Sequence, residues 1–140
     1  MKILLLPLLL FCSLLVNAQD EESLILVNKE NEKMDKAFLE AKETLDQFIS
    51  RATVQRKEHE IYGAYIKVVQ NEVVEYLWVS DFQKYNETYF IGVLITKPEL
   101  TTQFKKGATI GFLKEDIFDW QIYDKNTDVL EGAFTFKALE

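Results

Sequence analysis

The chain has little of the side chains on which most catalytic and metal sites depend. Its 140 residues include one cysteine, Cys12, and one histidine, His59. Structural zinc sites take several cysteines or histidines, so no metal site of that kind is expected. A single cysteine also leaves no partner for a disulfide. Because the sequence shows neither a glycine-rich phosphate loop nor a nucleophile elbow, we expect no cofactor and assign no catalytic residue.

Positive charge is also scarce. Acidic residues outnumber basic ones by 23 to 16, which gives a formal net charge of −7. A negative protein repels phosphate backbones and anionic lipid surfaces, so neither nucleic acid nor a membrane surface is an expected partner. What the chain does have is aromatic side chains. Its ten phenylalanines, six tyrosines and two tryptophans favour a β-rich interior.

Residues 1–18 have the pattern of a secretory signal peptide. An apolar run follows Lys2 and ends in short residues before Ala18, where a signal peptidase cleaves. The run is shorter than the roughly 20 residues that a membrane span needs. An uncleaved anchor and a lipid attached to Cys12 are the alternatives. We expect an exported protein, periplasmic or secreted, with cleavage between Ala18 and Gln19 and no membrane contact afterwards.

The remaining residues predict a short N-terminal segment, residues 19–30, and a single domain, residues 31–140. The apolar group Leu24 to Val27 in the segment predicts a short strand or a stretch laid on the core. The domain begins with an amphipathic helix that runs to about Arg51, with Asn31 as its N-cap. Apolar residues at intervals of three and four define the helix face turned to the core: Met34, Ala37, Phe38, Ala41, Leu45, Phe48, Ile49 and Ala52.

From Ile61 onward the apolar period changes to two, which is typical of strands. The apolar faces of the first two predicted strands are Tyr62, Ala64, Ile66 and Val68, then Val74, Tyr76 and Trp78. A tight turn at residues 70–72 joins them into a hairpin. Residues 80–87 predict a polar loop, and further strands are predicted at residues 88–95, 108–113, 120–123 and 130–139.

These elements predict an α+β fold, in which the N-terminal helix packs on a curled antiparallel sheet of five or six strands. Single residues carry predictions of their own. Gly92 marks a bulge or the close approach of a neighbouring aromatic side chain. Leu100 and Phe104 are expected to reach the core from a turn that opens at Pro98.

Five short motifs resemble a known bacterial family. They are Glu75-Tyr76-Leu77-Trp78, Phe90-Ile91-Gly92-Val93-Leu94, Gly107-Ala108-Thr109-Ile110, Ile117-Phe118-Asp119-Trp120 and Gly132-Ala133-Phe134-Thr135. In this order they resemble the domain of unknown function 2314 family of YegJ-like bacterial proteins, over about residues 27–139. Tyr76 stands where that family often has histidine. Because the family has no established activity, the resemblance implies a fold and no function.

The candidate binding residues are carboxylates and tryptophans. They are Glu75, Trp78, Asp81, Glu115, Asp116, Asp119 and Trp120. Carboxylates held a few ångströms apart in a cleft can act as acid and base in glycoside hydrolysis, or bind calcium. At a chain corner they more often accept backbone N–H groups and cap turns. Exposed tryptophans can stack on a sugar or a peptide, but both tryptophans are expected in the core.

Two other ionisable residues invite interpretation. Glu75 stands between apolar neighbours on a strand and is expected to be buried, with Lys67 or a tyrosine hydroxyl as its partner. His59 is flanked by Glu58 and Glu60 and is expected to be solvated.

The sequence supports three functional hypotheses. The first is a small exported, non-catalytic binding or interaction module that uses the sheet face or the loops at residues 80–87 and 114–119. The second is a hydrolase of envelope polymers with Glu75, Asp116 or Asp119 as acid and base. The third is a periplasmic inhibitor or immunity-type protein whose acidic surface blocks a basic active site. The expected partner is a protein or a small ligand of the cell envelope.

Overall fold

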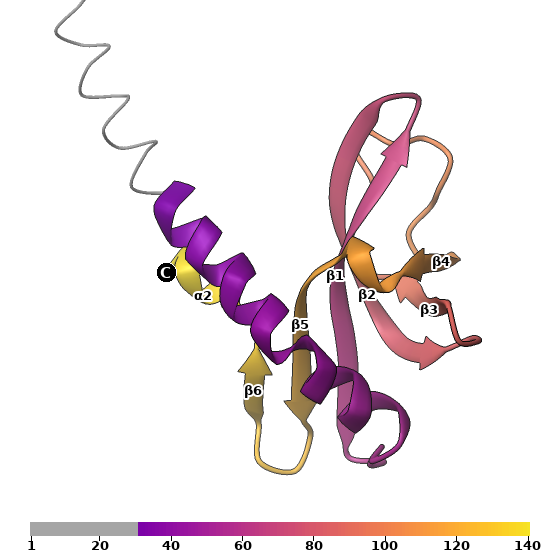
Figure 1. Cartoon of the computed structure of the whole chain (residues 1–140). Helices are drawn as coiled ribbons and strands as arrows, with labels where there is room; N and C mark the ends of the chain where they lie inside the picture. The colour runs from indigo at the N-terminus through magenta and orange to yellow at the C-terminus, as the bar shows by residue number, and fades with distance from the viewer. Residues whose placement is uncertain (1–30) are drawn as a thin grey trace, which may run out of the picture. The chain divides into compact units, whose positions relative to one another are not determined.

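The computed structural model describes residues 31–140 (Figure 1). The predicted signal peptide and the apolar group Leu24 to Val27 therefore lie outside the described residues. The chain divides into two units, Met1–Asp35 and Lys36–Glu140. The described residues of the first unit, 31–35, are helical. The architecture given below is that of the second unit.

The long helix covers residues 31–53, close to the predicted range. In the second unit its buried residues follow the predicted stripe, and none is more than 6% exposed: Ala37, Ala41, Leu45, Phe48 and Ala52. Their spacing places them on one side of the helix, where they join the hydrophobic core. Most of the stability of a protein helix comes from packing such an apolar face, so this stripe both orients and stabilises the helix.

Six antiparallel strands form one open sheet in the order β4-β3-β2-β1-β5-β6 (Figure 1). The strands are β1 Glu60–Gln70, β2 Val73–Lys84, β3 Tyr89–Leu94, β4 Thr109–Leu113, β5 Ile117–Asp124 and β6 Val129–Gly132. A short 3₁₀ helix, η1 Lys114–Asp116, precedes β5, and a short helix, α2 Phe134–Ala138, follows β6. The predicted α+β fold, with its helix and antiparallel sheet, is confirmed.

The hairpin of β1 and β2 gives the sheet two different faces. A two-residue turn at Asn71 and Glu72, both with positive φ, pairs Gln70 with Val73. This register sets even-numbered residues of β1 opposite odd-numbered residues of β2. Since the even residues of β1 point to the core, the odd residues of β2 do so too, and Leu77 and Val79 are buried.

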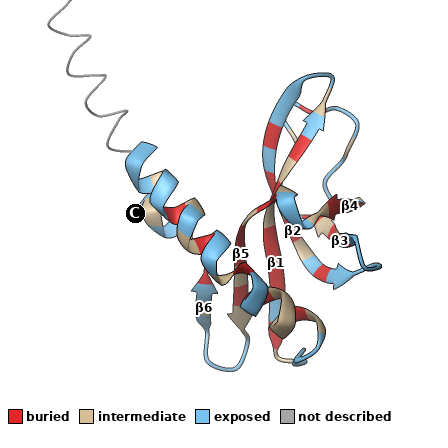
Figure 2. Ribbon diagram, viewed as in Figure 1, coloured by how far each residue is buried: buried red, intermediate tan, exposed pale blue. Residues whose placement is uncertain are grey.

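The predicted apolar face of the second strand is therefore the outer face. Val74 and Tyr76 are 42% and 37% exposed, and Trp78 is half-buried. The prediction that Trp78 lies in the core is wrong, because the turn fixes the pairing and the pairing fixes which side each residue faces. Figure 2 shows buried and more exposed residues alternating along these strands.

Two segments continue differently from the prediction. The predicted loop at residues 80–87 is largely strand, since β2 runs to Lys84 and Phe82 is fully buried. A bulge with Asp81 at φ 51° lets the strand continue past Ser80. The predicted strand 130–139 ends at Gly132 and is replaced by α2, because Gly132 and Ala133 both take positive φ and turn the chain out of the sheet.

Of the remaining predictions for single residues, some are confirmed and others are wrong. Leu100 is 62% exposed, so its predicted place in the core is wrong, and Thr101 is buried there instead. Phe104 packs against the core as predicted. A neighbouring side chain does approach Gly92 closely, since a Cβ at that position would lie 2.7 Å from a methyl carbon of Val79, but this neighbour is a valine and not the predicted aromatic.

An aromatic cluster fills the core between the helix and the sheet. Phe48 stacks on Trp120 with ring centroids 5.2 Å apart and meets Phe82 at 4.9 Å. The indole N–H of Trp120 donates to the hydroxyl of Thr44 at 2.9 Å, so the buried donor is satisfied within the protein. The predicted core position of Trp120 is thus confirmed, and the hydrogen bond ties the helix to β5.

Candidate functional site

Asp119 is fully buried on β5 and contacts the start of α2. Its carboxylate accepts hydrogen bonds from the backbone N–H groups of Phe134 (3.3 Å) and Thr135 (2.8 Å) and from the Thr135 hydroxyl (2.6 Å). It also accepts one from the backbone N–H of Trp120 at 2.8 Å. The first N–H groups of a helix lack partners within the helix, so Asp119 caps α2 from a strand. Burial raises the pKa of Asp119, and these hydrogen bonds oppose the rise.

The same joint requires a glycine. Gly132 has φ +74°, and a Cβ there would lie 2.4 Å from the carbonyl oxygen of Trp120 and 2.6 Å from its indole ring. The next residue, Ala133, donates its N–H to that carbonyl at 2.7 Å. The motifs Ile117 to Trp120 and Gly132 to Thr135 therefore form one structural joint between β5 and α2, which accounts for their residue types without a ligand.

Glu75 is buried on β2 and holds a loop. Its carboxylate accepts the backbone N–H groups of Glu99 (2.9 Å), Leu100 (2.9 Å) and Thr101 (3.2 Å), and the Thr101 hydroxyl (2.8 Å). Burial alone would raise the pKa of Glu75, but these hydrogen bonds outweigh burial and lower it to about 2. The predicted burial is confirmed. The predicted partners, Lys67 or a tyrosine hydroxyl, are wrong, because the loop supplies its own donors.

The other carboxylates predicted as candidate binding residues make different contacts from one another and do not form one site. Asp116 accepts the N–H of Leu113 at 3.0 Å and so caps η1. Asp81 is exposed at the β2 bulge, and Glu115 is exposed on η1. Glu75, Asp116 and Asp119 thus each serve a different segment, namely a loop, η1 and α2. The paired acid and base that the hydrolase hypothesis needs is not among these contacts.

Five aromatic rings form a continuous row at the surface. Tyr65 lies 5.0 Å from Trp78 and 5.7 Å from Tyr76, measured between ring centroids. Tyr76 meets the ring of Phe118 edge-on at 5.2 Å, and Phe118 meets Phe38 of the long helix at 5.6 Å. None of the five is buried. We call this set the aromatic row.

The sheet surface that carries the row has very little charge. The outward residues of the hairpin are Tyr65, Lys67, Val69, Val74, Tyr76, Trp78 and Ser80. Lys67 is the one charged residue among them, on a chain whose net charge is −7. Val69 and Val74 form a cross-strand pair and are 56% and 42% exposed. Contiguous apolar surface of this kind marks interaction sites on soluble proteins.

Each end of the row borders a hollow. Beside Trp78 is a shallow hollow of about 290 Å³, lined by Trp78, Ile95, Thr96, Gln121, Leu130 and Phe136. At the other end is a cleft of about 540 Å³, lined by Phe38, Lys42, Leu45, Asp46, Lys114, Glu115, Ile117 and Phe118. The second lies between the long helix and the η1–β5 corner, and we call it the helix cleft. Volumes of several hundred cubic ångströms are typical of ligand sites.

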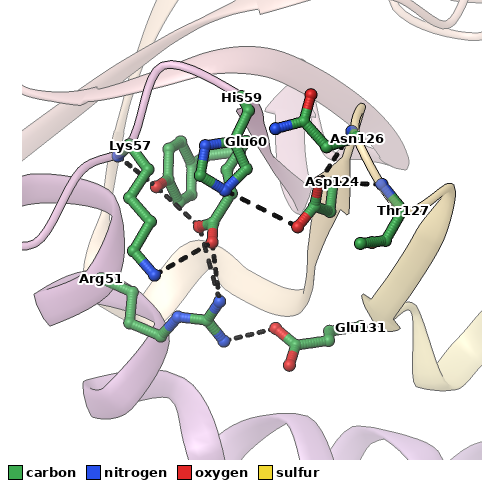
Figure 3. A network of polar contacts seen from close by, with 9 residues as sticks. Arg51, Lys57, His59, Glu60, Asp124, Asn126, Thr127 and Glu131 are labelled. Atoms are coloured by element: carbon green, nitrogen blue, oxygen red, sulfur yellow. Dashed lines mark hydrogen bonds and ion pairs between the residues drawn. The ribbon is translucent and has the colours of Figure 1, made fainter.

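A separate polar network joins the end of the long helix to β1 and β6 (Figure 3). The buried carboxylate of Glu60 accepts the Tyr62 hydroxyl at 2.8 Å and pairs with the guanidinium of Arg51 at 3.3 Å. Arg51 also pairs with Glu131, and Lys57 lies 3.9 Å from Glu60. Burial opposes ionisation of Arg51, but its contacts with Glu131 and Glu60 raise the pKa. The network fixes the helix end on the sheet.

His59, Glu60 and Asp124 in this network have ligand atoms within 4.8 Å of one another. His59 lies 3.7 Å from Asp124 and is half-exposed, close to the predicted solvated state. Glu60, however, is already engaged by Arg51 and by the Tyr62 hydroxyl, and a divalent cation would have to compete with that guanidinium. The contacts therefore describe an internal ion-pair network, and we assign no metal to it.

Sequence reasoning named Trp78 as a candidate but missed the rest of the aromatic row. The apolar spacing predicts Phe38 on the core stripe of the helix and Tyr76 on an apolar strand face. A usable signal was present in the sequence, since a two-residue turn at Asn71-Glu72 sets the faces of both strands once one face is known. The contribution of Phe118 is a property of the β5 bulge, where the register shifts between Tyr65 and Ile66.

Comparison with known proteins gives a family. Residues 31–140 match the model of a family described as an uncharacterized protein conserved in bacteria, DUF2314. The chain is also similar to the uncharacterized protein YegJ of Escherichia coli strain K12, with 27% identity over 138 residues, covering 99% of this chain and 87% of that protein. No solved structure gives a significant match. In residues 31–140, no helix is long and apolar enough to cross a membrane.

Proposed function

We propose that this chain, which belongs to the DUF2314 family of bacterial proteins, is an exported, non-catalytic module. Its proposed role is to bind a protein partner of the cell envelope. The observation that carries the proposal is the aromatic row, together with the nearly uncharged sheet face around it. Export rests on the signal-peptide pattern of residues 1–18.

The chemistry of the row favours a protein as the partner. Tyrosine and tryptophan are enriched at protein interfaces, because a large rigid ring buries much apolar area while its polar end can still form hydrogen bonds. The three residues that the β1–β2 hairpin contributes to the row, Tyr65, Tyr76 and Trp78, are of these types. An interface of this kind gains its affinity chiefly from a few such anchors.

The contacts of the carboxylates favour binding over hydrolysis. A general acid or base has to reach the substrate, within hydrogen-bonding distance or through one water. Glu75 and Asp119 are buried, and each accepts four hydrogen bonds from groups of the protein itself. Asp116 caps η1. The outward hairpin residues around the row, named above, include no carboxylate, so this surface offers a partner apolar contact and not negative charge.

The proposal is tested by comparing two matched double variants. Tyr76→Ser with Trp78→Ser removes two rings of the row. Tyr85→Ser with Tyr89→Ser removes two rings that are 70% and 47% exposed and do not belong to the row. Each variant and the wild-type full chain is tagged, expressed in the native bacterium and used to capture partners from its envelope. A captured protein is then purified, and its Kd for each form is measured by calorimetry.

We expect the row variant to weaken binding by about tenfold or more, since each lost interface anchor is typically worth at least that factor. The control variant should bind within about twofold of wild type. Equal binding by both variants would place the interface elsewhere. Capture of no protein by the wild type would remove the proposed function.

A further inference from the structure

The helix cleft begins where the aromatic row ends. Phe118 contacts Tyr76 of the row at 5.2 Å and also lines the cleft. Phe38, which meets Phe118 at 5.6 Å, lines it from the side of the long helix. A partner that covers the row therefore reaches the mouth of the cleft without a gap in the apolar surface.

Two contacts join the walls of the cleft. The ion pair between Lys114 of η1 and Asp46 of the long helix bridges them at the surface. The hydrogen bond from the Trp120 indole to Thr44 ties the same two elements in the interior at 2.9 Å. A cleft with braced walls binds at a lower entropic cost, because little of the protein has to be ordered when it is filled.

The lining favours an uncharged, apolar occupant. Leu45 and Ile117 are 6% and 7% exposed, and with the two phenylalanine rings they make the interior apolar. The charged lining residues are Lys42, Lys114, Asp46 and Glu115, two of each sign. A charged occupant would gain little from a lining whose charges cancel, whereas an apolar group gains from leaving water.

Two charged residues of the cleft can form hydrogen bonds with a peptide backbone. Among residues 31–140, neither Lys42 nor Glu115 takes part in an ion pair. Lys42 lies on the helix side and Glu115 on the η1 side. One can donate to a carbonyl oxygen and the other can accept an N–H group, which suits the main chain on either side of an inserted side chain.

We propose that the helix cleft is the anchor pocket of the interface and receives a large apolar side chain from the partner protein. The inference rests on the proposed function, since it assumes that the partner covers the row. The volume of about 540 Å³ leaves room for the anchor and part of a flanking residue. Interface anchors typically fill such pockets and are surrounded by contacts that exclude water.

Site-specific photo-crosslinking tests this pocket separately from the row. The photoreactive amino acid p-benzoylphenylalanine is placed in the full chain at Glu115 in the cleft, at Tyr76 in the row, or at Glu43 as a control. Glu43 is exposed on the long helix and does not line the cleft. Cells are irradiated, and adducts are identified by mass spectrometry.

We expect positions 115 and 76 to crosslink to the same protein, position 115 to a segment with a large apolar residue, and position 43 to give no such adduct. A crosslink from 76 without one from 115 overturns the anchor pocket and leaves the proposed function standing. Crosslinks from neither position overturn both. An adduct at 115 that extracts into organic solvent shows that a lipid fills the cleft, which also overturns the inference.

A pair of lysine variants gives a quantitative check with the purified partner. Lys42→Trp fills the cleft from its helix side, whereas Lys36→Trp makes the same change at an exposed helix position outside it. Binding should weaken by about tenfold or more for Lys42→Trp and stay within about twofold for Lys36→Trp. Equal affinities for the two variants would overturn the inference.

Discussion

The inner face of the sheet, which packs against the long helix, and the outer face of β1 and β2 are both rich in aromatic rings, but only the inner face is covered. Phe48, Phe82 and Trp120 are at most 7% exposed in the core. On the outer face, Tyr76 is 37% exposed, and none of the row is buried. Aromatic content alone therefore does not distinguish a core from a binding surface.

The two faces of the sheet differ in the helix that packs against each of them. The long helix supplies an apolar stripe to the inner face. On the outer face, α2 packs at β5, where Asp119 caps that helix, and its Phe136 lines the hollow beside Trp78. On β1 and β2, the rings contact one another, Phe118 and Phe38 of the long helix, which stacks on Tyr76 with ring centroids 6.4 Å apart, and none of the five is buried. The predictions below test this difference, because core positions should control stability and outer positions should control binding.

The largest effect is expected at the centre of the inner face. Phe48→Ala removes a fully buried ring that contacts both Phe82 and Trp120. Truncation of a buried phenylalanine leaves a cavity, and we expect the free energy of unfolding to fall by about 3–5 kcal/mol. Urea denaturation followed by tryptophan fluorescence measures the change. A loss below about 1 kcal/mol would mean that this cluster is not the core.

The next effect is expected at the joint between β5 and α2. Asp119→Asn keeps the shape of the side chain but turns an amide N–H₂ towards donors, so some of the four hydrogen bonds are lost. We expect a destabilisation of about 2–3 kcal/mol, since buried donors lose their acceptor. Amide hydrogen exchange should be faster in the variant than in wild type at Thr135, and this increase should be larger at Thr135 than in β1. Unchanged protection at Thr135 would contradict the capping role.

A smaller and pH-dependent effect is expected for Glu75→Gln, with a loss of about 1–2 kcal/mol at neutral pH. The pKa of Glu75 is lowered from 4.5 to about 2 in the folded state. Its contribution is therefore complete above pH 4.5 and is lost as the pH falls towards 2. The difference in unfolding free energy between wild type and variant should shrink over that interval. A difference that is independent of pH would exclude the ionised carboxylate as the cause.

The smallest effect on stability is expected on the outer face. Tyr76→Ser removes a ring that is 37% exposed and contacts the rings of Tyr65 and Phe118, and we expect the unfolding free energy to fall by about 1 kcal/mol or less. The same variant should weaken partner binding, which Phe48→Ala, assayed well below its melting temperature, should not do directly. If Tyr76→Ser destabilised the protein as much as Phe48→Ala, the row would be a second core.

Much of the fold could be predicted from the sequence, because periodicity is a local property. The stripe on the long helix, the alternation in β1 and the turn between β1 and β2 follow from spacings of a few residues. The predicted strand 130–139 failed for a non-local reason. The segment does alternate between apolar and polar residues. However, Gly132 packs against Trp120, and the N–H of Thr135 donates to Asp119, sixteen residues earlier in the sequence.

The candidate site shows the same division. Residue patterns alone were enough to predict that Val74, Tyr76 and Trp78 share one face of a strand, that Glu75 is buried, and which bacterial family the chain belongs to. Three features became clear from the folded chain: this face points outward, Glu75 and Asp119 accept hydrogen bonds from a loop and from a helix, and the helix cleft adjoins the row. The physical reason is that spacing places residues on one side of an element, whereas burial depends on what the rest of the chain packs against that side.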